Sequence, residues 1–219
     1  MPPNKYLRIK AGRNAKKRIL EKGIQAVDVK VFSAAAAGPK WLIMFELDKF
    51  LINHFFKNTT HKIHFAGGSI GSWRAMTYCL NDAPQAIERL HHAYVHQSYS
   101  DAPFGEEVSA GIKKIVEQAL GENGLKNLFQ PSNRKLHISV SRATFKTYGK
   151  MSTFQKLRFA PAYLVNIFSR NGMSRFFERV IFTNAEKPIF KPDGYKSHNR
   201  NISKEILLDA LCALSLIHI

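Results

Sequence analysis

One pentapeptide in the sequence has the composition and spacing of a nucleophilic serine site. Residues 67–71 are Gly-Gly-Ser-Ile-Gly, which places Ser69 among Gly67, Gly68 and Gly71. In a Gly-x-Ser-x-Gly elbow, a sharp turn between a strand and a helix lifts the serine hydroxyl clear of the sheet, and glycines relieve the crowding. The pentapeptide therefore predicts a nucleophile at Ser69. A glycine-rich turn without chemistry would have the same composition.

A second segment of small residues is suited to supply the hydrogen-bond donors that such a serine needs. Attack on an ester carbonyl creates an oxyanion, which backbone N–H groups at the start of a helix stabilise. Residues 34–41 are Ala-Ala-Ala-Ala-Gly-Pro-Lys-Trp, so an acyl group could approach the main chain closely there. A tightly packed turn between a strand and a helix would need the same small residues.

Both segments lie between a predicted strand and a predicted helix. Residues 27–32 alternate in polarity and are rich in β-branched side chains, as in a strand, and residues 41–56 carry apolar side chains at helical spacing. Residues 63–66 predict a short buried strand, and residues 72–80 resume a helical pattern. Two strand-turn-helix units in succession predict an α/β fold with a mainly parallel sheet flanked by helices.

The remaining pattern adds further elements without a linker that would divide the chain. A basic helix is predicted over residues 8–22 and ends at Gly23, since glycine favours the left-handed conformation past a helix end. We favour a solvated helix there. Further helices are predicted at residues 84–95, 106–120 and 203–214, and further strands at residues 135–141 and 179–183. We therefore expect a basic N-terminal segment over residues 1–26 and one domain over residues 27–213.

The order and spacing of these motifs resemble a bacterial branch of the patatin-like phospholipases. The resemblance rests on the turn ending in Gly-Pro-Lys-Trp, the helix after it, a strand, and Gly-Gly-Ser-Ile-Gly-Ser-Trp-Arg-Ala, and it is strongest over residues 27–80. It implies a patatin-like fold and a serine lipid acyl hydrolase that forms an acyl-enzyme at Ser69. It also implies that no metal or organic cofactor is needed.

The resemblance assigns roles within the first small-residue turn as well. The family's glycine-rich oxyanion loop corresponds to residues 36–41, where the N–H groups of Ala37 and Gly38 are the candidate donors and Lys40 stands at the family's basic position. Alanine and tryptophan replace glycine at three places in this loop. We therefore expect the backbone to avoid positive φ at those places.

The family's second catalytic residue is an aspartate, which this sequence does not show where the resemblance requires it. The resemblance implies a Ser-Asp dyad whose carboxylate takes the serine proton and lies in an Asp-Gly-Gly or Asp-Gly-Ala segment late in the domain. Asp193 belongs to the only Asp-Gly pair, but it precedes the last predicted helix. Lys-Pro-Asp-Gly is also typical of a plain β-turn, so Asp193 is a weak candidate for the acid.

The last six residues suggest an explanation for the missing aspartate. Residues 214–219 are Leu-Ser-Leu-Ile-His-Ile, which a transposase end sequence used in preparing sequencing libraries would encode. A natural apolar end is the alternative. We expect a non-native tail over these residues, a domain that lacks its aspartate, and a chain of poor or no catalytic activity.

The charge composition favours polyanionic partners. The formal net charge is +17 and the isoelectric point is near 10.0, which attracts either nucleic acid or an anionic membrane surface. We expect a lipid or phospholipid ester as substrate, with peripheral contact to anionic lipid. A basic nucleic-acid-binding domain is the alternative, although the sequence has no helix-turn-helix, zinc-finger or RNP pattern. Residues 154–177 interleave aromatic and basic side chains, which suits a lipid surface or a solvated edge.

The cysteines and the hydropathy pattern predict a cytoplasmic protein. Cys79 and Cys212 form no Cys-x-x-Cys pair and are expected to be reduced core residues. No apolar run approaches the roughly 20 residues that cross a bilayer, and residues 1–22 lack the apolar block of a signal peptide.

Two other constellations of polar residues are weaker candidates for a site. His92 and His96 lie four apart on a predicted helix, but no acidic or cysteine partner stands at ligand spacing, so no metal is expected. A Ser-Asp-His triad would use Asp193 and His198 with Ser69. Such hydrolases normally carry the acid and the histidine on different loops, whereas these two are close in sequence.

Overall fold

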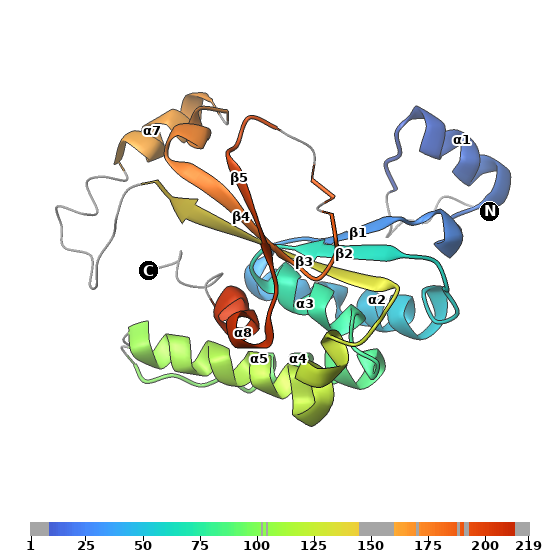
Figure 1. The fold of residues 1–219 in the computed structure, drawn as a ribbon, viewed down its shortest axis with the longest axis horizontal. Helices are drawn as coiled ribbons and strands as arrows, with labels where there is room; N and C mark the ends of the chain where they lie inside the picture. The colour runs from blue at the N-terminus through green and yellow to red at the C-terminus, as the bar shows by residue number, and fades with distance from the viewer. Residues whose placement is uncertain are drawn as a thin grey trace.

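Five strands form one mixed, mostly parallel sheet in the computed structural model (Figure 1). The structure describes residues 9–101, 103, 105–144, 160–169, 171–187, 189–190 and 193–212. The strands lie in the order β1 (Val31–Ala34), β2 (Ile63–Gly67), β3 (Arg134–Ala143), β4 (Phe177–Thr183) and β5 (Ser197–Asn201). Only the pair β3 and β4 is antiparallel. The predicted α/β class is therefore confirmed.

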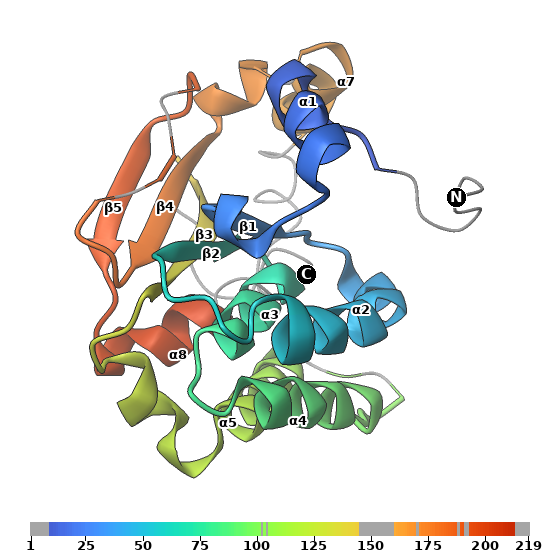
Figure 2. The ribbon, with the colours of Figure 1, turned by 90° about the vertical axis from the view of Figure 1, so that its right-hand side faces the viewer.

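Most of the helices cover one side of this sheet. Figures 1 and 2 share their vertical axis, and in both views the helices below the sheet are α2 (Phe45–Phe50), α3 (Ile70–Tyr78), α4 (Ala83–Val95), α5 (Gly105–Leu128) and α8 (Lys204–Cys212). Helices α1 (Arg13–Lys22) and α7 (Ala160–Phe168) lie above it. The described residues also form four short helical segments: η1 (Ala26–Asp28), η2 (Gly38–Met44), η3 (Leu51–Phe55) and η4 (Asn171–Arg175).

The core lies between the sheet and the layer of helices below it. Phe65 of β2 stacks on Tyr78 of α3, with ring centroids 5.1 Å apart, and Phe32 of β1 meets the same tyrosine at 4.9 Å. Phe65 of β2 pairs with Leu136 of β3, Ile138 follows two residues later, and these three side chains are fully buried on this side. This packing holds the first two strand-turn-helix units together.

The first predicted strand begins later than its sequence pattern indicated. Residues 26–28 form the 3₁₀ turn η1, and β1 starts only at Val31. An ion pair between Arg18 and Asp28, 2.7 Å long, joins this turn to α1. Residues 27–32 therefore do not form one strand, because a turn interrupts the alternating pattern.

The helix between β1 and β2 is continuous, as predicted, but its winding changes along its length. It begins as the 3₁₀ helix η2 at Gly38, continues as α2, and ends as a π turn in η3. Pro39 lies at its first turn, where a missing N–H costs no hydrogen bond.

The helix predicted to end at residue 120 does so because of a glycine. Gly121 has φ 65° and ψ −177°, which breaks α5 into two helical parts. Arg89 of α4 fills the break and donates hydrogen bonds to the carbonyls of Gln118 and Ala119, each 3.1 Å long. A cation at the C-terminus of a helix satisfies its free carbonyls and its dipole.

The other predicted elements are found close to their expected places, but helix α7 (Ala160–Phe168) and one strand were not predicted. Helices α4 and α8 and strands β3 and β4 match their predicted ranges within a few residues, and α1 is shorter at its start. Strand β5 was missed, because Ser-His-Asn-Arg-Asn has no apolar alternation. Two predicted features lie outside the described residues: the tail at residues 214–219, and residues 154–159 at the start of the aromatic and basic stretch.

Candidate active site

Ser69 lies at a strained turn between β2 and α3. β2 ends at Gly67 and α3 begins at Ile70, so Ser69 is the residue that caps the helix. Its φ is 50° and its ψ is −139°, and no other non-glycine residue in the described part of the chain has positive φ. Such a conformation costs about 1–3 kcal/mol and persists only where the surrounding structure imposes it.

Two of the motif glycines are required because backbone crosses backbone at this turn. A Cβ on Gly67 would lie 2.3 Å from the carbonyl carbon of Gly71, and a Cβ on Gly71 would lie 2.3 Å from the carbonyl oxygen of Ala34. Neither neighbour is a side chain that could move aside. Gly68 differs, since its Cβ would meet the Ser139 carbonyl oxygen at 3.4 Å, an ordinary contact.

The crossing also brings the elbow against the small-residue segment that follows β1. Ala34 is paired with Gly67 across the parallel strands, so both segments leave the same edge of the sheet. Gly71 approaches the carbonyls of Ala34 and Ala35 too closely for any side chain to fit. The predicted nucleophile and the predicted oxyanion loop are thus neighbours at the carboxyl ends of β1 and β2.

Both segments present free backbone donors. Among the described residues, no hydrogen bond engages the N–H groups of Ala37 and Gly38, nor that of Ile70 at the start of α3. Gly38 has φ 51°, whereas Ala37 has φ −127°. The loop therefore avoids positive φ at its alanines and at Trp41, as expected from their replacement of glycine.

The last two residues of the loop, Lys40 and Trp41, differ in burial. The Lys40 N–H donates to the carbonyl of Ala37 over 3.2 Å, while the Lys40 side chain is exposed. Trp41 is fully buried and packs edge-on against Tyr94 and His91 of α4, with ring centroids 5.5 and 6.1 Å apart. A tryptophan at this position anchors η2 in the core, which explains why glycine is not needed there.

A buried ion pair connects the two helices that begin at the candidate site. Arg74 of α3 donates to both carboxylate oxygens of Asp48 in α2, over 2.7 and 2.8 Å, and the Tyr78 hydroxyl donates to the same carboxylate over 2.7 Å. Asp48 and Tyr78 were not predicted as site residues, and Arg74 entered only as part of the motif around Ser69. The sequence did contain a signal for this pair: Asp48 lies on the apolar face of a predicted helix, and a buried carboxylate needs a polar or charged partner.

The hydroxyl of Ser69 is half-buried and has no hydrogen-bond partner within the described part of the chain. Asp193 binds Arg179 instead, with two contacts of 3.1 and 2.6 Å, and this guanidinium lowers the pKa of the carboxyl. Gly194 beside it has φ 85°, as in a turn. His198 contacts Glu178 at 3.2 Å, not Asp193, so the structure does not assemble the triad from these residues.

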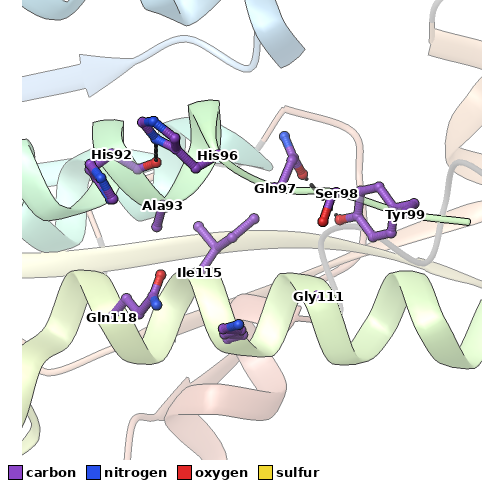
Figure 3. A pocket seen from close by; sticks show the side chains of 10 residues that line it. His92, Ala93, His96, Gln97, Ser98, Tyr99, Gly111, Ile115 and Gln118 are labelled. Carbon is purple, nitrogen blue, oxygen red and sulfur yellow. Dashed lines mark hydrogen bonds between the residues drawn. The ribbon is translucent and has the colours of Figure 1, made fainter.

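Ser69 lines neither of two cavities that lie elsewhere in the described part of the chain. One, of about 270 Å³, lies between α4 and α5 and is lined by His92, His96 and Tyr99, among others (Figure 3). The imidazole rings of the two histidines stack 4.1 Å apart, and His96 contacts the His92 carbonyl. The other, of about 430 Å³, lies beside Thr183 and Ile202. In the described ranges, no three His, Cys, Asp or Glu side chains gather as metal ligands.

A pair of histidines that the sequence analysis did not single out lies on β2 and β3. His64 Nδ1 is 2.8 Å from His137 Nε2, and His137 is fully buried between β2 and β4. Burial and the neighbouring imidazole lower the pKa of His137 to about 4. Burial, Lys62 and Lys135 lower the pKa of His64 as well. Only one of the two facing nitrogens can carry a proton, so the pair is stable when both rings are neutral.

This pair predicts that acid destabilises the protein. Because the pKa of His137 is 6.5 in an unfolded chain and about 4 when folded, the unfolded state binds the extra proton between these values. The free energy of unfolding therefore has its full value above pH 6.5. It falls by roughly 3 kcal/mol as the pH drops from 6.5 to about 4. Urea unfolding at a series of pH values measures this loss. His137→Gln should flatten the dependence, and an unchanged slope would contradict the assignment.

Comparisons with known proteins add no family assignment to this geometry. The chain matches no protein-family model, and neither curated proteins nor solved structures give a significant match. Among the described residues, no helix is both long enough and apolar enough to cross a membrane.

Proposed function

We propose that this protein is a serine lipid acyl hydrolase of the patatin-like type, with Ser69 as its nucleophile. The observation that carries the proposal is the backbone of Ser69, the one described non-glycine residue at positive φ, at a turn where Gly67 and Gly71 leave no room for a side chain. A glycine-rich turn with a purely structural role would place glycine at the strained position. Serine at this position strains the backbone, and it also places a hydroxyl at the start of the helix.

The neighbouring loop supports the same reaction. The Ser69 oxygen would attack the ester carbonyl carbon, and the N–H groups of Ala37 and Gly38 would stabilise the negative oxygen that forms. Collapse of this intermediate releases the alcohol and leaves the acyl group on Ser69, and water then attacks to release the acid and restore the hydroxyl. The resemblance implies an aspartate as the acceptor of the serine proton, and the described carboxylates include none bonded to Ser69.

The surface of the helix after the loop supports a lipid substrate. Ile43, Leu47 and Phe50 follow one another at helical spacing, and Ile43 and Phe50 are 83% and 53% exposed. Met44 is exposed beside them. Exposed apolar side chains gathered in one place commonly mark a binding surface. The exposed apolar residues Ile43, Met44 and Phe50 begin five residues after Gly38. The acyl chains of a lipid ester bound at Gly38 would reach them.

A fluorophosphonate probe tests the proposal directly. Such a probe forms a phosphorus–oxygen bond with an activated serine and loses fluoride, so the adduct marks the nucleophile. The tryptic peptide over residues 63–74 contains both Ser69 and Ser72, so fragmentation of the labelled peptide must place the adduct. We expect it on Ser69 and not on Ser72, which is fully buried. Mass spectrometry of the folded and heat-denatured protein makes the comparison. An adduct on another serine or equal labelling after denaturation would contradict the proposal, and no adduct at all would show that Ser69 is not activated in this chain.

A further inference from the structure

Helix α1 (Arg13–Lys22) stands apart from the rest of the protein. None of its residues is buried, and Figures 1 and 2 show it on the side of the sheet away from α2, α3, α4 and α5. It carries Arg13, Lys16, Lys17, Arg18 and Lys22 against the single acid Glu21. A helix that buries nothing gains no stability from the core, so its side chains are available for another partner.

The two sides of α1 differ in their contacts. Arg18 pairs with Asp28 over 2.7 Å, and Ile19 is its one half-buried residue, so this side faces the following turn. Leu20 lies on the opposite side and is 76% exposed. Lys17, Lys16 and Arg13 precede Leu20 by three, four and seven residues, so they share its face. We name Arg13, Lys16, Lys17 and Leu20 the outer face of α1.

The outer face has unpaired cations and apolar neighbours. Within the described residues, no ion pair involves Arg13, Lys16 or Lys17. The chain beyond the helix exposes Ile24 and Val27, the latter by 58%, and no described acid other than Glu21 and Asp28 lies between residues 13 and 31. Cations surrounding exposed aliphatic side chains therefore make up this end of the molecule.

We propose that the outer face of α1 binds an anionic lipid surface, with Leu20 inserted between the headgroups. Lysine and arginine are attracted to the anionic surface, and an apolar side chain among them gains by leaving water. Nucleic acid would satisfy the cations but offers phosphates, not hydrocarbon, to Leu20. The inference does not require Ser69 to be catalytic, although it would bring a lipid hydrolase to its substrate.

Sedimentation with vesicles tests the outer face. The full chain should bind vesicles that contain phosphatidylglycerol, bind phosphatidylcholine vesicles weakly, and lose binding as salt is raised. Replacing Lys16 and Lys17 with glutamate should lower the partition coefficient at least thirtyfold, since each cation near the surface contributes about fivefold and two are lost. Leu20→Ser should lower it about tenfold at unchanged charge.

Matched variants separate this surface from the general charge of the protein. Lys126→Glu with Lys204→Glu makes the same change of net charge on α5 and α8, where both lysines are exposed, and should leave vesicle binding nearly unchanged. Equal losses in the two double variants would overturn the proposal. So would tighter binding to a DNA duplex that Leu20→Ser does not affect. Because α1 buries no residue, the variants should unfold at the same temperature as the parent, which circular dichroism checks.

Discussion

Hydrolysis of a short-chain aryl ester is expected to fall to the uncatalysed rate when Ser69 is replaced with alanine. The acyl-enzyme route needs the hydroxyl, so its loss should be complete and not partial. The parent rate is itself expected to be low, because general-base catalysis contributes about 10² to 10⁴ in rate and no described carboxylate contacts Ser69. Initial rates of the parent and of Ser69→Ala, each corrected for buffer, make the measurement.

Two matched variants sharpen this result. Ser69→Gly should be equally inactive but more stable than Ser69→Ala by about 1 kcal/mol, because glycine adopts positive φ without strain and alanine does not. Asp193→Asn should leave the rate unchanged, because Arg179 already holds that carboxylate. Activity retained in Ser69→Ala would place the nucleophile elsewhere. A rate lost in Asp193→Asn would instead make that residue the proton acceptor.

The elbow could be predicted from sequence because its requirements are local. Glycine is required at residues 67 and 71 because a Cβ on either residue would collide with neighbouring backbone. The short apolar run of β2 and the helical spacing of α3 then predict the strand and the helix on either side. Local sterics and periodicity together therefore located Ser69 and the segment around Ala37.

The parts that sequence did not predict depend on distant partners. β5 carries no apolar alternation and exists because β4 pairs with it. The His64 and His137 contact joins residues 73 apart, and nothing in either neighbourhood signals it. The start of β1 was misplaced because the pairing of Arg18 with Asp28 favours a turn where propensity alone favours a strand.

Replacing Asp48 with alanine is expected to cost about 3–5 kcal/mol of the free energy of unfolding, the largest stability loss that we predict. The carboxylate is fully buried and its partner Arg74 is nearly so, and removal of one charge leaves the other without water or counter-ion. Tyr78→Phe removes only one hydrogen bond to the charged group and should cost roughly 2 kcal/mol. Urea unfolding measures both losses.

A partly exposed ion pair between α2 and α4 provides the control for this prediction. Lys49 of α2 contacts Glu88 of α4 over 2.9 Å, and both side chains are partly exposed to water. Glu88→Gln should therefore lower the free energy of unfolding by less than about 1 kcal/mol. Replacing Asp48 and Arg74 together with leucine and methionine should cost less than Asp48→Ala, because no buried charge is left unpaired. If the double variant loses as much stability as Asp48→Leu and Arg74→Met lose in sum when each is made alone, the pair does not act as a unit.

The position of this ion pair links stability to the candidate site. Asp48 lies on the helix that follows the Ala37 and Gly38 donors, and Arg74 lies on the helix that follows Ser69. The pair therefore fixes the two helices whose starts must face one carbonyl group. Where the double apolar variant folds, its fluorophosphonate labelling at Ser69 should be slower than in the parent, because leucine and methionine hold α2 and α3 by packing without a directed hydrogen bond. Labelling at the parent rate would show that packing alone positions the two segments.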